Sequence, residues 1–254
     1  MEGPTHLLYH VYPLSAARDM VEWNIDQIVS RRAAFTGQAV VTVATGPETL
    51  PFSEVRDRFP KDWLVLEVPN NRKLREVVGW NAGWPHLERL GGQVLFCHAK
   101  GVTRYIRDYA QEAKSWTWMM YRTLIDFPLQ VASVLRSHPL AGSFKKRIKG
   151  FTPESPAPWH YHGAFYWLRA DIFPRWKDIL QVWFGVESFP GDILPEDKLG
   201  GEVFTPRQWR GPQLNLYNRT ICQDTVKEEE EWERTTLDWK SQLTGKSKAS
   251  SIAT

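Results

Sequence analysis

The sequence lacks the short motifs that most directly indicate a phosphate or nucleotide site. It contains neither the Gly-x-Gly-x-x-Gly fingerprint of dinucleotide-binding folds nor the Gly-x-x-x-x-Gly-Lys-Ser/Thr segment of P-loop proteins. It also contains no Asp-x-Asp, a pair of carboxylates that can hold a divalent cation. Any phosphate group that this chain binds must therefore be held by other residues.

Cysteine, long apolar runs and strong net charge are scarce as well. The 254 residues include two cysteines, Cys97 and Cys222, which are too few for a disulfide framework and too far apart for a Cys-x-x-Cys site. Lysine and arginine exceed aspartate and glutamate by 32 − 29 = 3, without the basic runs of dedicated nucleic-acid binders. No apolar run approaches the ~18 residues of a membrane span, and the N-terminus lacks signal-peptide features. We therefore expect a cytoplasmic protein without a nucleic-acid partner and without an integral membrane segment.

Tryptophan, in contrast, is abundant, with 13 residues in the chain. The indole is large, and its N–H group needs a polar partner when it is buried. So many tryptophans exceed what a core of this size needs. The excess predicts a surface or cleft that stacks flat ligands or sugar rings.

Alternating apolar and amphipathic segments in the first part of the chain predict strand–helix–strand units. The predicted strands are residues 6–12, 39–44, 63–68 and 93–98, and the predicted helices are residues 15–35, 50–59 and 71–90. This order is typical of an α/β/α fold with a mixed, mostly parallel central sheet. We expect a single α/β domain of this kind over residues 1–243.

The second half of the chain is less regular. Its predicted elements are a helix over 105–135 interrupted near Pro128, a strand at 141–144, an aromatic strand at 159–169, and helices at 171–184 and 226–243. Residues 187–206 are rich in glycine and proline, and a loop of that length is more often functional than idle. Residues 244–254 are polar and are predicted to be a disordered tail.

Polar residues follow several of the predicted strands, where ligands of open α/β sheets bind. They are His10, Tyr12 and Pro13 after the first strand, Thr45 after the second, and His98 with Lys100 after the fourth. His98 and Lys100 are two residues apart, so they point to the same side of the strand. Lys100 would suit a diphosphate, because its ammonium group is a compact charge with three donors.

The aromatic strand carries a second candidate site. If residues 159–169 form one regular strand, His160 and His162 lie on one face and Trp159 and Tyr161 on the other. Paired histidines could bind a metal with a third ligand. No histidine or carboxylate at ligand spacing accompanies them, so we favour a platform for a sugar acceptor and predict no metal-ligand set.

Charged residues supply the remaining candidates. Arg75 lies at the start of the predicted helix 71–90, and a helix start with basic side chains can hold an anion. Carboxylates in the predicted loop could act as a general base, because a loop side chain can reach a substrate hydroxyl. These carboxylates are Glu187, Asp192, Glu196, Asp197 and Glu202.

Several of these segments together resemble GT-A-like glycosyltransferases, most closely the rhamnan-synthesis F group. The resemblance covers roughly residues 6–205. The segments are the His-Val-Tyr-Pro strand end at 10–13, the helix opening with Arg75-Glu76, the His98-Ala-Lys100 strand end, the following Trp/Arg helix, and Gly163-Ala-Phe-Tyr-Trp-Leu-Arg169. The resemblance implies a GT-A-like, Rossmann-like domain that transfers a sugar from a nucleotide-diphosphate sugar to a glycan or polysaccharide acceptor. A nucleotide-sugar half would span about 1–103 and an acceptor half about 104–220.

The resemblance also implies roles for individual residues. His10, Tyr12, Pro13, Thr45, Arg75, His98 and Lys100 would bind the donor, and Trp159, His160, Tyr161 and His162 would bind the acceptor. His98 and Lys100 stand where such enzymes usually have Asp-x-Asp, so Lys100 would offset the diphosphate charge directly. This departure leaves metal dependence open, with a divalent cation, Mn²⁺ or Mg²⁺, as a possible cofactor. The catalytic base would be Glu187, Glu196 or Asp197.

Two alternatives stay open at this point. The first is a non-catalytic carbohydrate-binding protein with the same fold, which the tryptophan content and the missing Asp-x-Asp favour. The second is a metal-dependent hydrolase that uses His98, His160 and His162. Hydrolysis of a donor sugar would exclude the binding protein.

Overall fold

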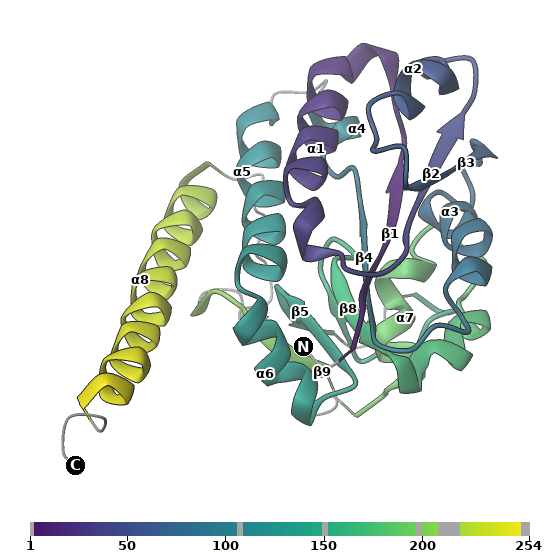
Figure 1. Cartoon of the computed structure of the whole chain (residues 1–254). Coiled ribbons are helices and arrows are strands. Elements are labelled where there is room, and N and C mark those ends of the chain that lie inside the picture. The colour runs from purple at the N-terminus through teal and green to yellow at the C-terminus, as the bar shows by residue number, and fades with distance from the viewer. Residues whose placement is uncertain (1–2, 106–108, 149–151, 197–199, 208–218, 250–254) are drawn as a thin grey trace.

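A seven-stranded sheet forms the centre of the computed structural model, which describes residues 3–105, 109–148, 152–196, 200–207 and 219–249 (Figure 1). The strands lie in the order β3 (Leu64–Pro69), β2 (Ala39–Thr45), β1 (Thr5–Val11), β4 (Gln93–His98), β8 (Tyr166–Arg169), β5 (Leu140–Ser143) and β9 (Gly200–Phe204). Strand β8 is antiparallel to both of its neighbours, and the other neighbouring pairs are parallel. The predicted mixed, mostly parallel α/β sheet is therefore confirmed.

Helices cover both faces of this sheet, and each face has its own apolar core. Side chains of α1 (Arg18–Ser30), α5 (Ala110–Tyr121) and α6 (Pro128–Ser137) pack on one face, together with those of the short helix α2 (Phe52–Arg56). Side chains of α3 (Glu76–Gly83) and α7 (Gly185–Ile193) pack on the other. Consecutive strand residues alternate between the faces, so Leu7 belongs to the first core and Leu8 to the second.

Most of the tryptophans lie in these cores, which corrects the interpretation of the tryptophan excess as a stacking surface. Among the tryptophans whose side chains the structure describes, Trp183 alone is exposed, at 49%. Trp80 and Trp84 stack on each other with ring centroids 4.9 Å apart. Four buried indole N–H groups in the described residues donate to backbone carbonyls, among them Trp159 to Leu194 and Trp167 to Leu124. Buried tryptophan is stable here because irregular segments supply acceptors for the N–H groups.

The predicted aromatic strand is divided into two, which is a second correction. Strand β7 (Trp159–Tyr161) pairs with β6 (Lys145–Arg147) in a separate two-stranded sheet, and β8 joins the central sheet. The chain turns at Gly163, where φ is +96°, and Ala164, where φ is +56°. Glycine has no Cβ and adopts this left-handed conformation without strain, so the turn is placed by Gly163.

The predicted loop 187–206 also contains regular structure. Helix α7 covers its first part and β9 its last part. The expected helix 105–135 is in fact three: α4 (Val102–Tyr105), then α5 continuing through a π-helical turn at Arg122–Asp126, then α6. Pro128 is the first residue of α6, a position where its missing N–H costs nothing. The expected helix 171–184 is a 3₁₀ helix over Ala170–Asp178.

The last helix, α8 (Arg219–Ala249), is longer at both ends than the predicted 226–243. It includes residues 244–249 of the predicted tail, and residues 250–254 lie outside the described part of the chain. Figure 1 shows it at the left of the molecule, next to α5. Among the helices that the structure describes, none combines the length and apolarity needed to cross a membrane.

Candidate active site

The candidate site lies where the strand order reverses. From β1 the chain proceeds outward to β2 and β3 and then returns to β4 on the other side of β1. In open α/β sheets this switch point leaves a crevice at the carboxyl ends of the two central strands. His10 at the end of β1 and His98 at the end of β4 are register partners. The structure therefore brings two of the predicted donor residues together at the expected edge.

Both of these histidines are held by neighbouring groups. The His98 Nε2–H donates to the Gly163 carbonyl at 3.0 Å, and its Nδ1 lies 3.6 Å from Glu76 Oε1. His10 Nδ1 and the Thr42 hydroxyl share a hydrogen bond of 2.9 Å. Burial, together with the Lys100 charge, lowers the pKa of His98 to about 3. Burial also lowers the pKa of His10 to about 4. Both rings are therefore neutral near pH 7.

Lys100 extends from the strand end toward the second candidate cluster. Its Nζ lies 4.6 Å from the centre of the Trp116 ring, a cation–π contact. The backbone of Lys100 is held by Asn24, whose Nδ2 donates to the Lys100 carbonyl at 3.1 Å. The Trp116 ring in turn stacks on His162, with centroids 5.0 Å apart and planes 19° apart. Lys100, Trp116 and His162 thus form one continuous stack between α5 and β7.

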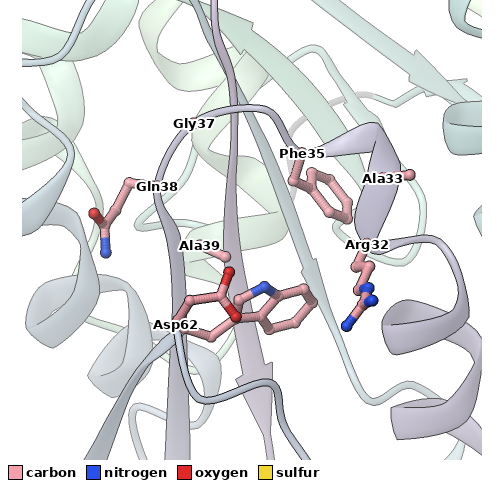
Figure 2. Close-up of a pocket in the computed structure, with 8 residues that line it drawn as sticks. Arg32, Ala33, Phe35, Gly37, Gln38, Ala39 and Asp62 are labelled. Atoms are coloured by element: carbon pink, nitrogen blue, oxygen red, sulfur yellow. The ribbon is translucent and has the colours of Figure 1, made fainter.

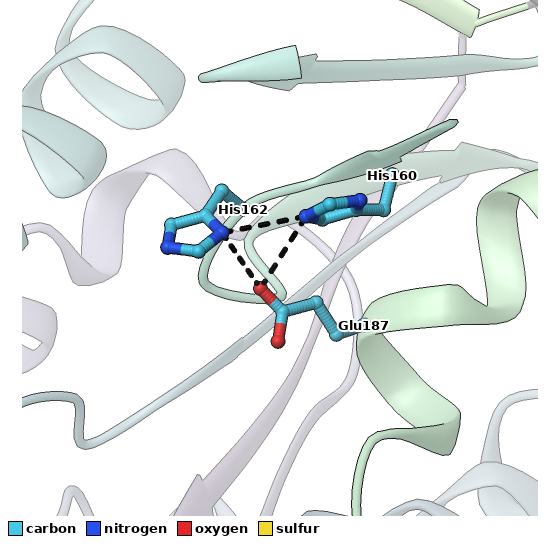
Figure 3. Close-up of side chains that lie close together, drawn as sticks. All are labelled: His160, His162 and Glu187. Atoms are coloured by element: carbon cyan, nitrogen blue, oxygen red, sulfur yellow. Dashed lines mark hydrogen bonds and ion pairs between the residues drawn. The ribbon is translucent and has the colours of Figure 1, made fainter. Parts of the chain in front are cut away.

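Glu187, in the first turn of α7, lies beside His160 of β7 and His162, which follows that strand (Figure 3). Its Oε1 accepts from the Gly163 N–H at 2.8 Å and lies 3.3 Å from His162 Nδ1 and 3.9 Å from His160 Nε2. The two imidazole nitrogens are 3.3 Å apart. Of the five predicted carboxylates, Glu187 is therefore the one that the described structure joins to the histidines.

The charges in this cluster follow from burial and from neighbours. Burial lowers the pKa of His160 to about 4 and of His162 to about 3, against the opposing effect of Glu187. Burial on its own raises the pKa of Glu187, but His162, Lys100, His160 and the Gly163 N–H outweigh it and lower the value to about 2. Near pH 7 the cluster therefore holds a carboxylate and two neutral imidazoles.

The remaining predicted donor residues lie along the same sheet edge. The Tyr12 hydroxyl donates to Glu48 Oε1 at 3.1 Å, and the Pro13 carbonyl accepts from the Leu50 N–H. Thr45 Oγ1 donates to Glu67 at 3.0 Å. Arg75 is exposed, and its guanidinium lies 4.9 Å from the centre of the Trp183 ring.

Two of the predicted acceptor residues do not face the site. Trp159 and Tyr161 are fully buried, and the Tyr161 hydroxyl donates to the Gly201 carbonyl at 2.7 Å. They pack behind β7 in the core, because the alternation of the strand turns them away from the side on which His160 meets Glu187. Glu196 is exposed, and Asp197 lies outside the described residues.

Sequence reasoning missed three residues of the site. Glu76 faces His98, Asn24 holds the Lys100 carbonyl, and Trp116 joins Lys100 to His162. Glu76 follows Arg75 at the start of α3, so its place after the third strand was a usable signal. Trp116 and Asn24 lie inside helices, where helical spacing predicts packing and says nothing about a partner on another element.

The strand end with His98 and Lys100 differs in its ability to hold a metal from the group of His160, His162 and Glu187, called the β7 cluster below. At the strand end, His98 uses Nε2–H for the Gly163 carbonyl and Lys100 is itself a cation, so these residues do not fit a divalent ion. In contrast, His160, His162 and Glu187 present three ligand atoms within 4.8 Å of one another. The predicted hydrolase set of His98, His160 and His162 is therefore not the one that the structure assembles.

A separate pocket of about 410 Å³ lies at the opposite edge of the sheet (Figure 2). Its lining includes Ala39, the first residue of β2, and Asp62 and Trp63, which precede β3. This is the amino edge of the strands, away from the carboxyl edge with His98 and Glu187. We therefore do not assign it to the candidate site.

The sequence matches no protein-family model and no curated protein. Among solved structures, the chain is similar to a 4-diphosphocytidyl-2C-methyl-D-erythritolsynthase from Anaerococcus prevotii, with TM-score 0.45, 8% identity, and coverage of 90% of this chain and 97% of that one. It is also similar to a proposed nucleotide-diphospho-sugar transferase from Desulfovibrio desulfuricans G20 (TM-score 0.43, 8% identity, coverage 89% and 97%). A third similar structure is a mycobacterial protein, with TM-score 0.44, 12% identity, and coverage of 88% of this chain and 73% of that one. At this level of similarity we draw nothing from these names about the ligands of this chain, and the rhamnan-synthesis F resemblance stays an expectation.

Proposed function

We propose that this protein transfers a sugar from a nucleotide-diphosphate sugar to a glycan acceptor. The observation that supports this most is the position of Lys100. A cationic side chain extends from the end of β4, at the carboxyl edge where the strand order reverses between β1 and β4, and it lies beside Glu187 and the histidines His160 and His162. Sugar transfer needs both features, a cation for the leaving diphosphate and a polar group for the acceptor hydroxyl.

On the donor side, Lys100 stabilises the negative charge that develops on the diphosphate as the bond to the sugar breaks. Its aliphatic stem is held near Gly163, where an added Cβ would lie 3.0 Å from Lys100 Cε. A charge fixed in this way stabilises the transition state without reorganising during the reaction. Tyr12, Thr45 and Arg75 line the same edge, and in this proposal they bind the nucleotide.

On the acceptor side, His160, His162 and Glu187 act on the hydroxyl that attacks the sugar. A carboxylate with a pKa of about 2 is a weak proton acceptor, because base strength falls with pKa. Glu187 therefore serves to hold and orient the other groups. His162 is the accessible member of the three, with 32% of its side chain exposed.

Nucleotide binding is the first test of this function. A ligand that binds only the folded chain raises its unfolding temperature. We expect one of UDP, GDP, dTDP, ADP or CMP to do so in a thermal-shift screen with and without Mn²⁺. If none of these nucleotides shifts the unfolding temperature, the carbohydrate-binding protein becomes the better interpretation.

Replacing Lys100 by methionine tests the role of its charge, since methionine keeps an unbranched apolar stem. We expect Lys100→Met to lower kcat/KM for transfer by about 10²–10³, the effect typical of losing one charge-stabilising donor. Lys114→Met is the matched control, because Lys114 lies over Trp23, 5.4 Å from the ring centre, on the side of α5 that faces α1. Equal transfer rates in the two variants would contradict the assignment.

A metal-dependent hydrolase is a second candidate, and the His160–His162–Glu187 geometry favours it. The two functions differ in what receives the cleaved group. Release of free sugar at the same rate with and without an acceptor glycan would support the hydrolase. Product that contains the enlarged glycan supports the transferase.

A further inference from the structure

The three ligand atoms of the β7 cluster are spaced as the corners of a metal coordination shell. For metal–ligand bonds of about 2.0–2.1 Å, the edge of a tetrahedron is about 3.3–3.4 Å. His162 Nδ1 lies 3.3 Å from both His160 Nε2 and Glu187 Oε1. The third edge, from His160 to Glu187, is 3.9 Å, so it needs to close by about half an ångström.

Each of the three side chains is held in place by something other than a metal. The His162 ring stacks on Trp116, and Glu187 Oε1 accepts the Gly163 N–H. His160 is 4% exposed and lies on β7, paired in register with Lys146 of β6. A site of this kind loses little side-chain freedom when an ion binds, because the rotamers are already restricted.

The exposure of the three residues leaves room for a fourth ligand. Side-chain exposure rises from 5% at His160 to 21% at Glu187 and 32% at His162, so the group opens toward solvent on the His162 side. Three protein ligands with an open position are typical of catalytic zinc, and closed four-residue sets are typical of structural zinc. Two imidazoles and one carboxylate suit zinc and similar ions better than Mg²⁺, which prefers oxygen ligands.

Neighbouring cationic side chains lower the affinity of this group for a metal ion. Lys100 and Lys146 both lie close enough to His162 to affect its charge, and both disfavour a bound cation. A diphosphate bound at Lys100 would cancel this repulsion. By reciprocity of binding, an ion and a nucleotide diphosphate should then strengthen each other's binding.

We propose that His160, His162 and Glu187 bind one divalent transition-metal ion of the zinc class, with an open position for a substrate oxygen. Ion binding stands on this geometry alone, and only the role of the ion rests on the proposed function. In that role, the ion lowers the pKa of the coordinated acceptor hydroxyl, which loses its proton to solvent. The acceptor oxygen then forms a bond to the sugar carbon while the bond from that carbon to the diphosphate oxygen breaks, and the diphosphate leaves with the electron pair.

The test uses the full chain, freed of metal with a chelator and titrated with Zn²⁺ by calorimetry and with Co²⁺ by visible absorption. We expect one ion per chain and the intense absorption of four-coordinate Co²⁺. Glu187→Gln and His162→Ala should each raise the Kd by roughly a hundredfold or more, beyond the effect of changing an outer-shell partner. The control is His86→Ala, an exposed histidine outside the site, which should bind the ion as the unaltered chain does.

The result that would overturn the inference is equal ion binding by Glu187→Gln, His162→Ala and His86→Ala, or no binding by the unaltered chain. Glutamine keeps an oxygen that can accept the Gly163 N–H, so Glu187→Gln should preserve the fold. Its unfolding temperature, compared with that of the unaltered chain, checks this. Ion binding without sugar transfer would count against the proposed function and leave the metal site standing. Sugar transfer by a chain that binds no ion would support the proposed function and count against the metal site.

Discussion

At the residue scale, the site depends on one turn and one close approach. The Gly163 peptide groups join β4 to α7, because its carbonyl accepts from His98 and its N–H donates to Glu187. The close approach is at Gly79 of α3. A Cβ built there would lie 2.1 Å from His10 Nδ1 and 2.4 Å from Thr42 Oγ1. Only glycine lets the helix lie this near the hydrogen bond between His10 and Thr42.

Gly79→Ala should therefore destabilise the chain despite being a small change. Overpacking of a filled interior typically costs about 1–3 kcal/mol, and we expect a loss of this order in the free energy of unfolding. Gly91→Ala is the control, since a Cβ there meets nothing within 4 Å. Urea unfolding of both variants measures the difference. Equal midpoints would show that His10 and Thr42 move aside without cost.

At the element scale, the described part of α8 binds the body of the molecule through an aromatic contact and an ionic contact. Trp232 packs against Phe127 and Phe204, with ring centroids 4.8 and 5.4 Å apart. Arg122 of the π-helical turn lies 3.4 Å from Glu229 and also pairs with Glu233. Glu229 is fully buried in this contact, and burial raises its pKa from 4.5 to about 6.

This shift predicts a pH dependence of stability. The folded chain binds the Glu229 proton more tightly than the unfolded chain. The free energy of unfolding therefore falls as the pH rises from 4.5 to about 6, and above this window the chain bears the whole cost of the buried carboxylate. The cost is about 2 kcal/mol, at about 1.4 kcal/mol for each unit of pKa. Glu229→Gln should thus raise the unfolding temperature at pH 7.5 by roughly 4–8 °C.

The gain from Glu229→Gln should shrink as the pH falls through 6 toward 4.5, because the native carboxyl becomes protonated. Scanning calorimetry of both chains across this range measures it. A variant that unfolds at a lower temperature than the natural chain at every pH would show that the ion pair with Arg122 outweighs the burial of Glu229.

At the scale of the whole molecule, two apolar layers share one sheet. Adjacent residues of β1 enter different layers, Leu7 facing α1 and α5 and Leu8 facing α3. The same two layers position the site, since Trp116 belongs to the first and Val186, next to Glu187, belongs to the second. Loss of either layer would therefore separate Lys100 from Glu187.

We expect both layers to unfold as one cooperative unit. Leu7→Ala and Leu8→Ala each remove a side chain that is fully buried, which typically costs about 2–5 kcal/mol. Each variant should show a single unfolding transition when tryptophan fluorescence and circular dichroism are followed together. Two separate transitions in either variant would show that the layers are independent.

The sequence by itself determined the first half of the fold and the sheet edge at which His10 and His98 lie. Strands β1 to β4 were predicted within about two residues, because unbroken apolar runs alternating with amphipathic helices leave few other arrangements. His98 and Lys100 were found because carboxyl ends of parallel strands are where side chains meet a ligand. The identity of Glu187 as one of a few candidate carboxylates was also within reach of the sequence.

Only the tertiary structure decided the second half and which side chains surround Glu187. Residues 159–169 are aromatic throughout, so their pattern did not show that the chain turns at Gly163 and enters two different sheets. Nor could it show that Trp159 and Tyr161 are buried while His160 and His162 face Glu187. That choice depends on α7 packing beside β7, a contact between segments about 25 residues apart that local periodicity does not encode.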